Sequence, residues 1–251
     1  MDRFDIGRAV KVPFEDASWV SKSLMALLWM MLVVTAPVVY GAQLEYIRRV
    51  AAGREDLPDW DDFGTKWVQG FLVGVAGFLY FLPVFVVGAF MIAPGVIAAI
   101  NDGSSDAAAA LLSGGMCIFG LLATVYTVAV SILFSAAMTH YAMSGSFGAF
   151  FQFGDIMAKV KGGTGYFGAW LWLIIISTVL STASSLLSSV TMGIGAIVMP
   201  AVSYLAAMMM AHILGQWASI AYGSRGAAGQ PPFIGAPPAP PAAMTPPAPP
   251  V

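Results

Sequence analysis

Residues 41–70 read GAQLEYIRRVAAGREDLPDWDDFGTKWVQG, a stretch that concentrates charged side chains between two long apolar runs of the chain. The run before it, residues 23–40, and the run after it, residues 71–100, contain no charged residue. Uncharged apolar runs of this length are typical of membrane-spanning helices. Residues 41–70 are therefore predicted to form a water-facing connection between two membrane segments.

The second half of this stretch predicts an amphipathic helix that lies on the membrane surface. Pro58 ends the preceding segment, and Asp59 can cap the free backbone N–H groups of a helix start. Polar residues occupy one face of this helix, and the other face is an aromatic stripe made of Trp60, Phe63, Trp67 and Phe71. Indole rings prefer the headgroup level of a bilayer. An ordinary amphipathic helix packed on a soluble core is the alternative.

The composition favours lipid as the solvent of the folded chain. Hydrophobic residues make up 59% and charged residues 10% of the 251 residues, against averages of roughly 45–50% and 25% in soluble domains. The mean hydropathy is +0.81. The formal net charge of -2 argues against a surface for nucleic acid. We therefore predict an all-α fold, a polytopic membrane helix bundle.

Five hydrophobic segments are predicted, at residues 23–40, 71–100, 107–138, 166–190 and 192–222. As a helix at 1.5 Å per residue, the second segment is about 45 Å long, whereas the hydrocarbon core of a bilayer is roughly 30 Å thick. This segment is therefore expected to tilt, to project beyond the bilayer, or to kink at Pro83 or Pro94.

Two further parts complete the predicted organisation. Residues 146–161 are predicted to form a second surface helix, with a polar stripe made of Gln152, Asp155 and Lys159. Residues 1–222 form the membrane domain. Residues 223–251 are rich in proline and alanine and are predicted to be a disordered tail.

The distribution of Lys and Arg predicts the orientation. The loops at residues 41–70 and 140–163 and the tail carry basic residues, whereas the turns after the second and fourth segments carry none. The positive-inside rule places these loops and the tail on the cytoplasmic side of the cell membrane. Five crossings then leave an outer N-terminus that carries Arg3, Arg8, Lys11 and Lys22. A first segment that turns back at Pro37 is the alternative, but a half-depth turn needs protein cover for its backbone.

Few side chains in the hydrophobic segments could form a polar pathway. The candidates are His212, Gln216 one turn further on, and a serine-rich face with Ser177, Ser181 and Ser185. Polar groups inside a membrane often mark solute or proton routes, but interhelical hydrogen bonds explain the same residues. The candidate interfacial anchors are Arg48, Arg49, Trp60, Phe63, Trp67 and Lys159.

No catalytic, cofactor-binding or metal site is predicted. The two histidines are far apart in the sequence, without placed carboxylate or thiol partners, and Cys117 stands alone in an apolar run. The sequence contains no HExxH, GxSxG or GxxxxGK motif. We therefore expect neither enzyme activity nor a cofactor.

Small residues recur at four-residue spacing in three segments: Gly70 and Gly74, the serine face, and Ala207, Ala211 and Gly215. Such faces let helix backbones approach closely in lipid. The expected partners are membrane lipids and, through these faces, a second copy of the chain or another membrane protein.

Residues 41–71, GAQLEYIRRVAAGREDLPDWDDFGTKWVQGF, resemble the signature of the membrane family called domain of unknown function 4013, found in bacteria and archaea. Val12-Pro13-Phe14 before the first segment and the later run HYAMSGSFGAFFQFGDIMAKVKGGTGYFGAW, residues 140–170, are similar to that family as well. The family's tyrosine beside the glycine appears here as Tyr40-Gly41, in reversed order. The resemblance covers about residues 8–222 and implies a polytopic membrane protein without an established activity.

Two functions remain open at this point. The first is a non-enzymatic membrane scaffold or complex component, favoured by the surface helices and the small-residue faces. The second is a transporter or channel for a small neutral or lipid-like solute, which would pass along the serine face and His212.

Overall fold

The computed structural model describes residues 4–32, 34–102, 106–191, 197 and 199–223, and every regular element in these ranges is helical. The elements are α1 (Ile6–Glu15), α2 (Trp19–Met31), α3 (Pro37–Ala51), α4 (Phe63–Asp102), α5 (Asp106–Ser144), the short 3-10 helix η1 (Phe147–Phe151), α6 (Phe153–Lys161), α7 (Tyr166–Val190) and α8 (Met199–Tyr222). The described part of the chain is therefore all-α, as the sequence predicts.

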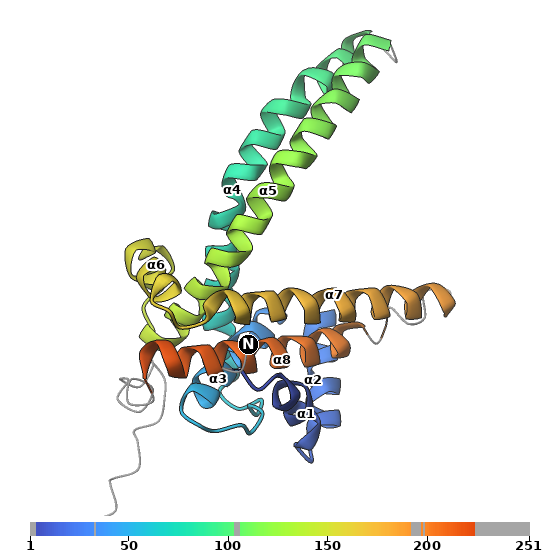
Figure 1. The fold of residues 1–251 in the computed structure, drawn as a ribbon. Helices are drawn as coiled ribbons and strands as arrows, with labels where there is room; N and C mark the ends of the chain where they lie inside the picture. Colours follow the sequence, from blue (N-terminus) through green and yellow to red (C-terminus); the bar gives the residue numbers. More distant parts are fainter. Residues whose placement is uncertain (1–3, 33, 103–105, 192–196, 198, 224–251) are drawn as a thin grey trace, which may run out of the picture.

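Two parts of the molecule differ in shape (Figure 1). α4 and α5 pack side by side as a long antiparallel pair, which we call the hairpin, and this pair projects away from the other helices. The other helices, together with the ends of α4 and α5 that meet them, form the base. In the base α8 lies in the middle, with α7 along one side and α1, α2 and α3 on the other.

The largest buried side chains lie in the base, among them Trp217, Tyr46, Tyr141, Tyr166 and Phe150. The far half of the hairpin instead exposes apolar side chains, including Phe85, Phe90, Ile97, Met116, Leu121 and Val125. Large contiguous apolar surfaces of this kind are typical of membrane-spanning or protein-binding regions.

Three helices in the described ranges are long and apolar enough to cross a membrane: Phe63–Ile100, Ser113–Ser144 and Tyr166–Val190. They correspond to the predicted second, third and fourth segments, and they indicate a membrane protein. The predicted count of five crossings is not confirmed. Residues 199–222 of the predicted fifth segment form α8, which is not one of these three helices.

The predicted first segment is two helices instead of one. α2 ends at Met31 and α3 begins at Pro37, so residues 23–40 do not form one crossing helix, and the break lies close to Pro37, where the alternative placed a turn. Pro37 is in the first position of α3, where its missing N–H removes no helical hydrogen bond. The hydroxyl of Thr35 donates to the carbonyl of Leu32 (2.8 Å) in the turn between them. α2 has 13 residues, about 20 Å, which is too short to cross a bilayer core of roughly 30 Å.

The helix after the charged loop begins at Phe63, three residues later than the start at Trp60 that a cap at Asp59 would give. It continues without interruption for 40 residues, so the predicted surface helix is the first part of α4. Its polar side is turned into the protein, because Lys66 and Gln69 are both 5% exposed. Pro83 and Pro94 lie inside α4 and do not end it.

The predicted second surface helix is divided. η1 covers residues 147–151 and α6 begins at Phe153, with Gln152 between them. α8 ends at Tyr222, and the division into a membrane domain of residues 1–222 and a tail stays a prediction. The predicted disordered tail, from residue 224 onward, lies outside the described residues.

α3 and α4 cross at two glycines, Gly41 and Gly70, where the helix backbones approach closely. A Cβ atom at Gly41 would lie 2.1 Å from the carbonyl oxygen of Lys66, and one at Gly70 would lie 1.7 Å from that of Pro37. A Cβ atom at Gly74, by contrast, would meet nothing within 4 Å. Only glycine therefore fits at the crossing, whereas Gly74 faces open space.

α8 makes a second close crossing, with α3. A Cβ atom at Gly215 would lie 2.5 Å from the Cβ atom of Val50 and 2.9 Å from the carbonyl oxygen of Ile47. The small residues predicted to pack helices closely thus do so within the chain at Gly70 and Gly215.

Candidate functional site

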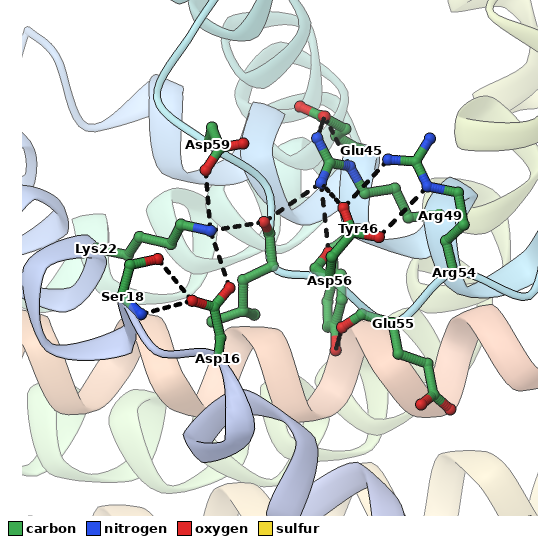
Figure 2. Close-up of polar contacts among 11 residues, drawn as sticks. Asp16, Ser18, Lys22, Glu45, Tyr46, Arg49, Arg54, Glu55, Asp56 and Asp59 are labelled. Carbon is green, nitrogen blue, oxygen red and sulfur yellow. Dashed lines mark hydrogen bonds and ion pairs between the residues drawn. The ribbon is translucent and has the colours of Figure 1, made fainter.

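The loop between α3 and α4 is held by a network of ion pairs (Figure 2). Arg49 pairs with Glu45 one turn earlier on α3 and with Asp56 in the loop. Arg54 also pairs with Asp56 (3.1 Å). Lys66 of α4 pairs with Glu45 (2.9 Å). The network therefore ties the loop to both of the helices that it joins.

Lys22 of α2 connects the N-terminal helices to the same loop (Figure 2). Its ammonium group pairs with Asp16 (2.9 Å) and Asp59 (3.0 Å) and donates to the carbonyl oxygen of Leu57 (2.8 Å). The side chain is 10% exposed. Burial disfavours the charge, but the two carboxylates outweigh that effect and raise the pKa of Lys22. This arrangement neutralises a buried cation within the protein.

His212 is 1% exposed and lies in the base between α8 and α3. Its Nδ1 atom is 3.2 Å from the hydroxyl oxygen of Tyr46, which is also 3.3 Å from the carbonyl oxygen of Glu55. The carboxylate of Glu55 pairs with Arg8 of α1. This hydrogen-bonded ion pair lowers the pKa of Glu55. Two successive hydrogen bonds, through Tyr46, thus connect His212 to the charged loop.

Gln216, one turn after His212, binds the backbone of Asp5 at the start of α1. Its Oε1 atom accepts from the backbone N–H (2.9 Å), and its Nε2 atom donates to the backbone carbonyl (3.1 Å). The side chain therefore fastens the N-terminal segment to α8.

The serines of the predicted pathway lie apart from His212. Tyr166 at the start of α7 packs on Trp217 near the end of α8, with ring centroids 4.7 Å apart, so the two helices are antiparallel. At 1.5 Å per residue, the residues from 177 to 185 then lie roughly 9 to 21 Å along the helix axes from the level of His212. Ser181 and Ser185 are exposed, and Ser177 is partly exposed. The structure brings His212 and Gln216 together on one helix but not with these serines.

The predicted anchors at the ends of α3 and α4 make polar contacts within the base. Arg48 donates to Oε1 of Gln69 (3.1 Å), and burial lowers its pKa to about 10. Arg49 belongs to the ion-pair network described above. The indole N–H of Trp67 donates to the carbonyl of Val34 (2.6 Å), in the turn between α2 and α3.

The remaining predicted anchors lie on the surface of the base or against α8. Phe63 is 36% exposed. The ring of Trp60 packs on Tyr204, with centroids 5.6 Å apart. The ammonium group of Lys159 lies 3.9 Å from the ring centroid of Tyr222.

A cluster around His140 was not foreseen from the sequence. Its Nδ1 atom is 2.7 Å from the hydroxyl of Tyr222, and its Nε2 atom is 2.9 Å from Oε1 of Gln152. The cluster joins the end of α8 to α5 and to the junction between η1 and α6. No sequence pattern links these three residues, because the contacts depend on how three separate elements pack.

Two surface pockets lie at the edges of the base. One, of about 620 Å³, lies at the start of α7 and is lined by Phe4, Lys161, Tyr166, Phe167 and Trp172, among others. The other, of about 410 Å³, lies between α3 and α4 beside Gly74. Neither pocket is lined by His212 or by the serines of α7.

Among the residues that the structure describes, no group of three or more His, Cys, Asp or Glu side chains could hold a metal ion. The charged groups described above pair with one another, which is an arrangement that stabilises the base. The predicted lack of a catalytic or cofactor site stays a prediction.

Comparison with known proteins identifies one family. The family model "Protein of unknown function (DUF4013)" matches residues 24–189. Neither the curated proteins nor the solved structures contain a match to the chain.

Proposed function

Because the chain belongs to the DUF4013 family of proteins of unknown function, and because an apolar hairpin projects from its base, we propose that it is a non-enzymatic membrane protein that acts as a scaffold or as a component of a membrane complex. Its partners would be lipids and either another membrane protein or a second copy of the chain.

The observation that supports this proposal most is the contrast between the hairpin and the base. In the base, the polar groups that could serve a reaction or a pathway hold elements together: His212 contacts Tyr46, and Gln216 binds Asp5. The hairpin exposes apolar side chains such as Phe85 and Phe90 on its outside. An extended apolar surface of this kind is suited to binding lipid and neighbouring membrane helices.

The orientation forms part of the proposal. Every Lys and Arg that the structure describes lies in the base or in the loops that belong to it. By the positive-inside rule, this distribution supports a base on the cytoplasmic side of a prokaryotic cell membrane. The tail follows α8 and would begin on the same side.

Photo-crosslinking in intact cells tests the scaffold. A benzoylphenylalanine placed at Phe85 or Phe90 is expected to give a protein adduct of discrete size, either with another protein or with a second copy of the chain. The same probe at Val10, an exposed position of α1 in the base, is the control and is expected not to give that adduct. Crosslinks to lipid alone from both hairpin positions would contradict a scaffold that binds through the hairpin.

Reconstitution tests the alternative, a transporter or channel for a small neutral or lipid-like solute. Liposomes that contain the protein are expected to swell in glycerol or urea no faster than empty liposomes. Faster swelling that is abolished by His212→Ala, with the variant still folded, would replace the scaffold by a solute pathway.

A further inference from the structure

Charged residues of other elements lie beside α8 near its start and towards its end. Near the start of the helix, Tyr204 packs on Trp60. The residue before Trp60, Asp59, forms an ion pair with Lys22 (3.0 Å). Towards the end of the helix, Gln216 binds the backbone of Asp5.

The middle of α8 also lies beside an ion pair. His212 contacts Tyr46, whose hydroxyl reaches the backbone of Glu55, and Glu55 pairs with Arg8. The side chains of Arg8 and Glu55 are 49% and 32% exposed. This ion pair is therefore not enclosed by protein.

These positions are incompatible with α8 as a membrane crossing. In a crossing helix of residues 199–222, His212 would lie near the middle of the bilayer, and the exposed pair of Arg8 and Glu55 would face hydrocarbon at that depth. A single charged side chain at the bilayer centre costs at least about 2.5–3.5 kcal/mol. The surface beside α8 that carries Arg8 and Glu55 must therefore face water.

α7 covers the opposite side of α8 and has an open surface of its own. Ala169, Leu173, Ile176 and Ser184 are buried on one face of α7. Other positions are exposed, among them Phe167, Leu171, Ile174, Val179 and Leu186. The exposed surface also carries Ser181 and Ser185, whose hydroxyl groups are tolerated better at the headgroup level than in the hydrocarbon.

The contact between α7 and the hairpin gives the depth of α7. The hydroxyl of Tyr166 donates to the carbonyl of Ile132 on α5, and the indole of Trp170 donates to the hydroxyl of Ser131 (3.3 Å). α5 begins at Asp106, so Ile132 lies about 39 Å along the helix from the far end of the hairpin. A bilayer has a hydrocarbon core of roughly 30 Å and measures about 40–45 Å with its headgroups. The start of α7 is then at the headgroup level on the side of the base, and Figure 1 shows α7 running across the foot of the hairpin.

We propose that α7 and α8 lie along the cytoplasmic surface of the membrane, with the open face of α7 in contact with lipid, and that the hairpin alone among the described helices crosses the bilayer. α7 is long and apolar enough to cross, but its packing on α8 holds it parallel to the membrane surface. The partner of this face is the lipid surface itself.

Depth measurements on spin labels test this arrangement. In full-length protein with Cys117→Ala, single cysteines replace the exposed residues Leu171, Val179 and Leu186, and each variant is labelled and placed in phosphatidylcholine–phosphatidylglycerol nanodiscs. Relaxation by oxygen and by a water-soluble nickel complex reports the depth of each label. The three labels on α7 are expected at similar depths near the headgroups.

Labels at Phe78 and Phe90 of the hairpin are the internal control, because they should differ in depth by up to about 18 Å along the helix. If α7 crossed the bilayer, the labels at 171 and 186 would differ by up to about 22 Å and one would lie near the bilayer centre. That result would overturn the proposal, and so would three α7 labels in water.

Discussion

Replacing Gly70 by alanine is expected to lower the free energy of unfolding by about 2 kcal/mol, because the added methyl group cannot fit at the crossing of α3 and α4. The Cβ atom would lie 1.7 Å from the carbonyl oxygen of Pro37 and 2.9 Å from the backbone nitrogen of Gly41. Both neighbours are backbone atoms, so no side chain can rotate away. The two helices must move apart along their contact.

The magnitude follows from two opposing effects. Overpacking of a close contact costs about 1–3 kcal/mol, and a clash with backbone belongs at the upper end. Alanine is better than glycine within a helix by roughly 0.5–1 kcal/mol. Gly74→Ala is the matched control, since the same helical gain applies and its Cβ atom would meet nothing within 4 Å. The two variants should differ by about 3 kcal/mol.

Equilibrium unfolding in mixed detergent micelles, with increasing fractions of sodium dodecyl sulfate and tryptophan fluorescence as the signal, measures both variants. Gly41→Ala should resemble Gly70→Ala, and the double variant should be less destabilised than the sum, because the first substitution already separates the helices. Equal stability of the Gly70 and Gly74 variants would refute the close crossing.

Three further predictions concern the polar contacts of the base. The pKa of Glu55 is lowered in the folded protein from its ordinary value of 4.5. The stabilisation that its carboxylate contributes is therefore present above pH 4.5 and is lost as the pH falls through the lowered pKa. Glu55→Gln should flatten this part of a plot of unfolding free energy against pH. Tyr46→Phe should cost about 1–2 kcal/mol in the same unfolding assay, because buried His212 loses its hydrogen-bond partner, and an unchanged midpoint would show that the contact contributes nothing. Lys22→Met should cost about 3 kcal/mol, since two carboxylates lose their cation, whereas Lys11→Met on the exposed side of α1 should stay within about 0.5 kcal/mol.

The composition and the lengths of the uncharged apolar runs predicted the membrane class, the hairpin helices and α7. Apolar character and run length depend on the local sequence alone. The family resemblance, carried by the charged loop and by the second loop, is confirmed by the family match. The preferred prediction, one crossing helix over residues 23–40, missed the break between α2 and α3. The alternative placed a turn at Pro37, which is the first residue of α3.

The environment of the charged loop was harder to predict because its partners come from distant parts of the chain. Lys66 lies on the polar face that the amphipathic pattern predicts to face water, but Glu45 of α3 pairs with it and allows its burial. α4 begins later than the sequence predicts for a related reason. Asp59 was expected to cap a helix, and it pairs instead with Lys22 of α2.

The most direct test of the membrane arrangement is the accessibility of single cysteines from outside intact cells. In the Cys117→Ala background, an impermeant maleimide should label a cysteine at Asp102, at the far end of the hairpin. It should leave cysteines at Asp61 and Lys159 of the base unlabelled until the membrane is permeabilised. Labelling of positions 61 and 159 in intact cells as readily as position 102 would contradict a base that lies on the cytoplasmic side.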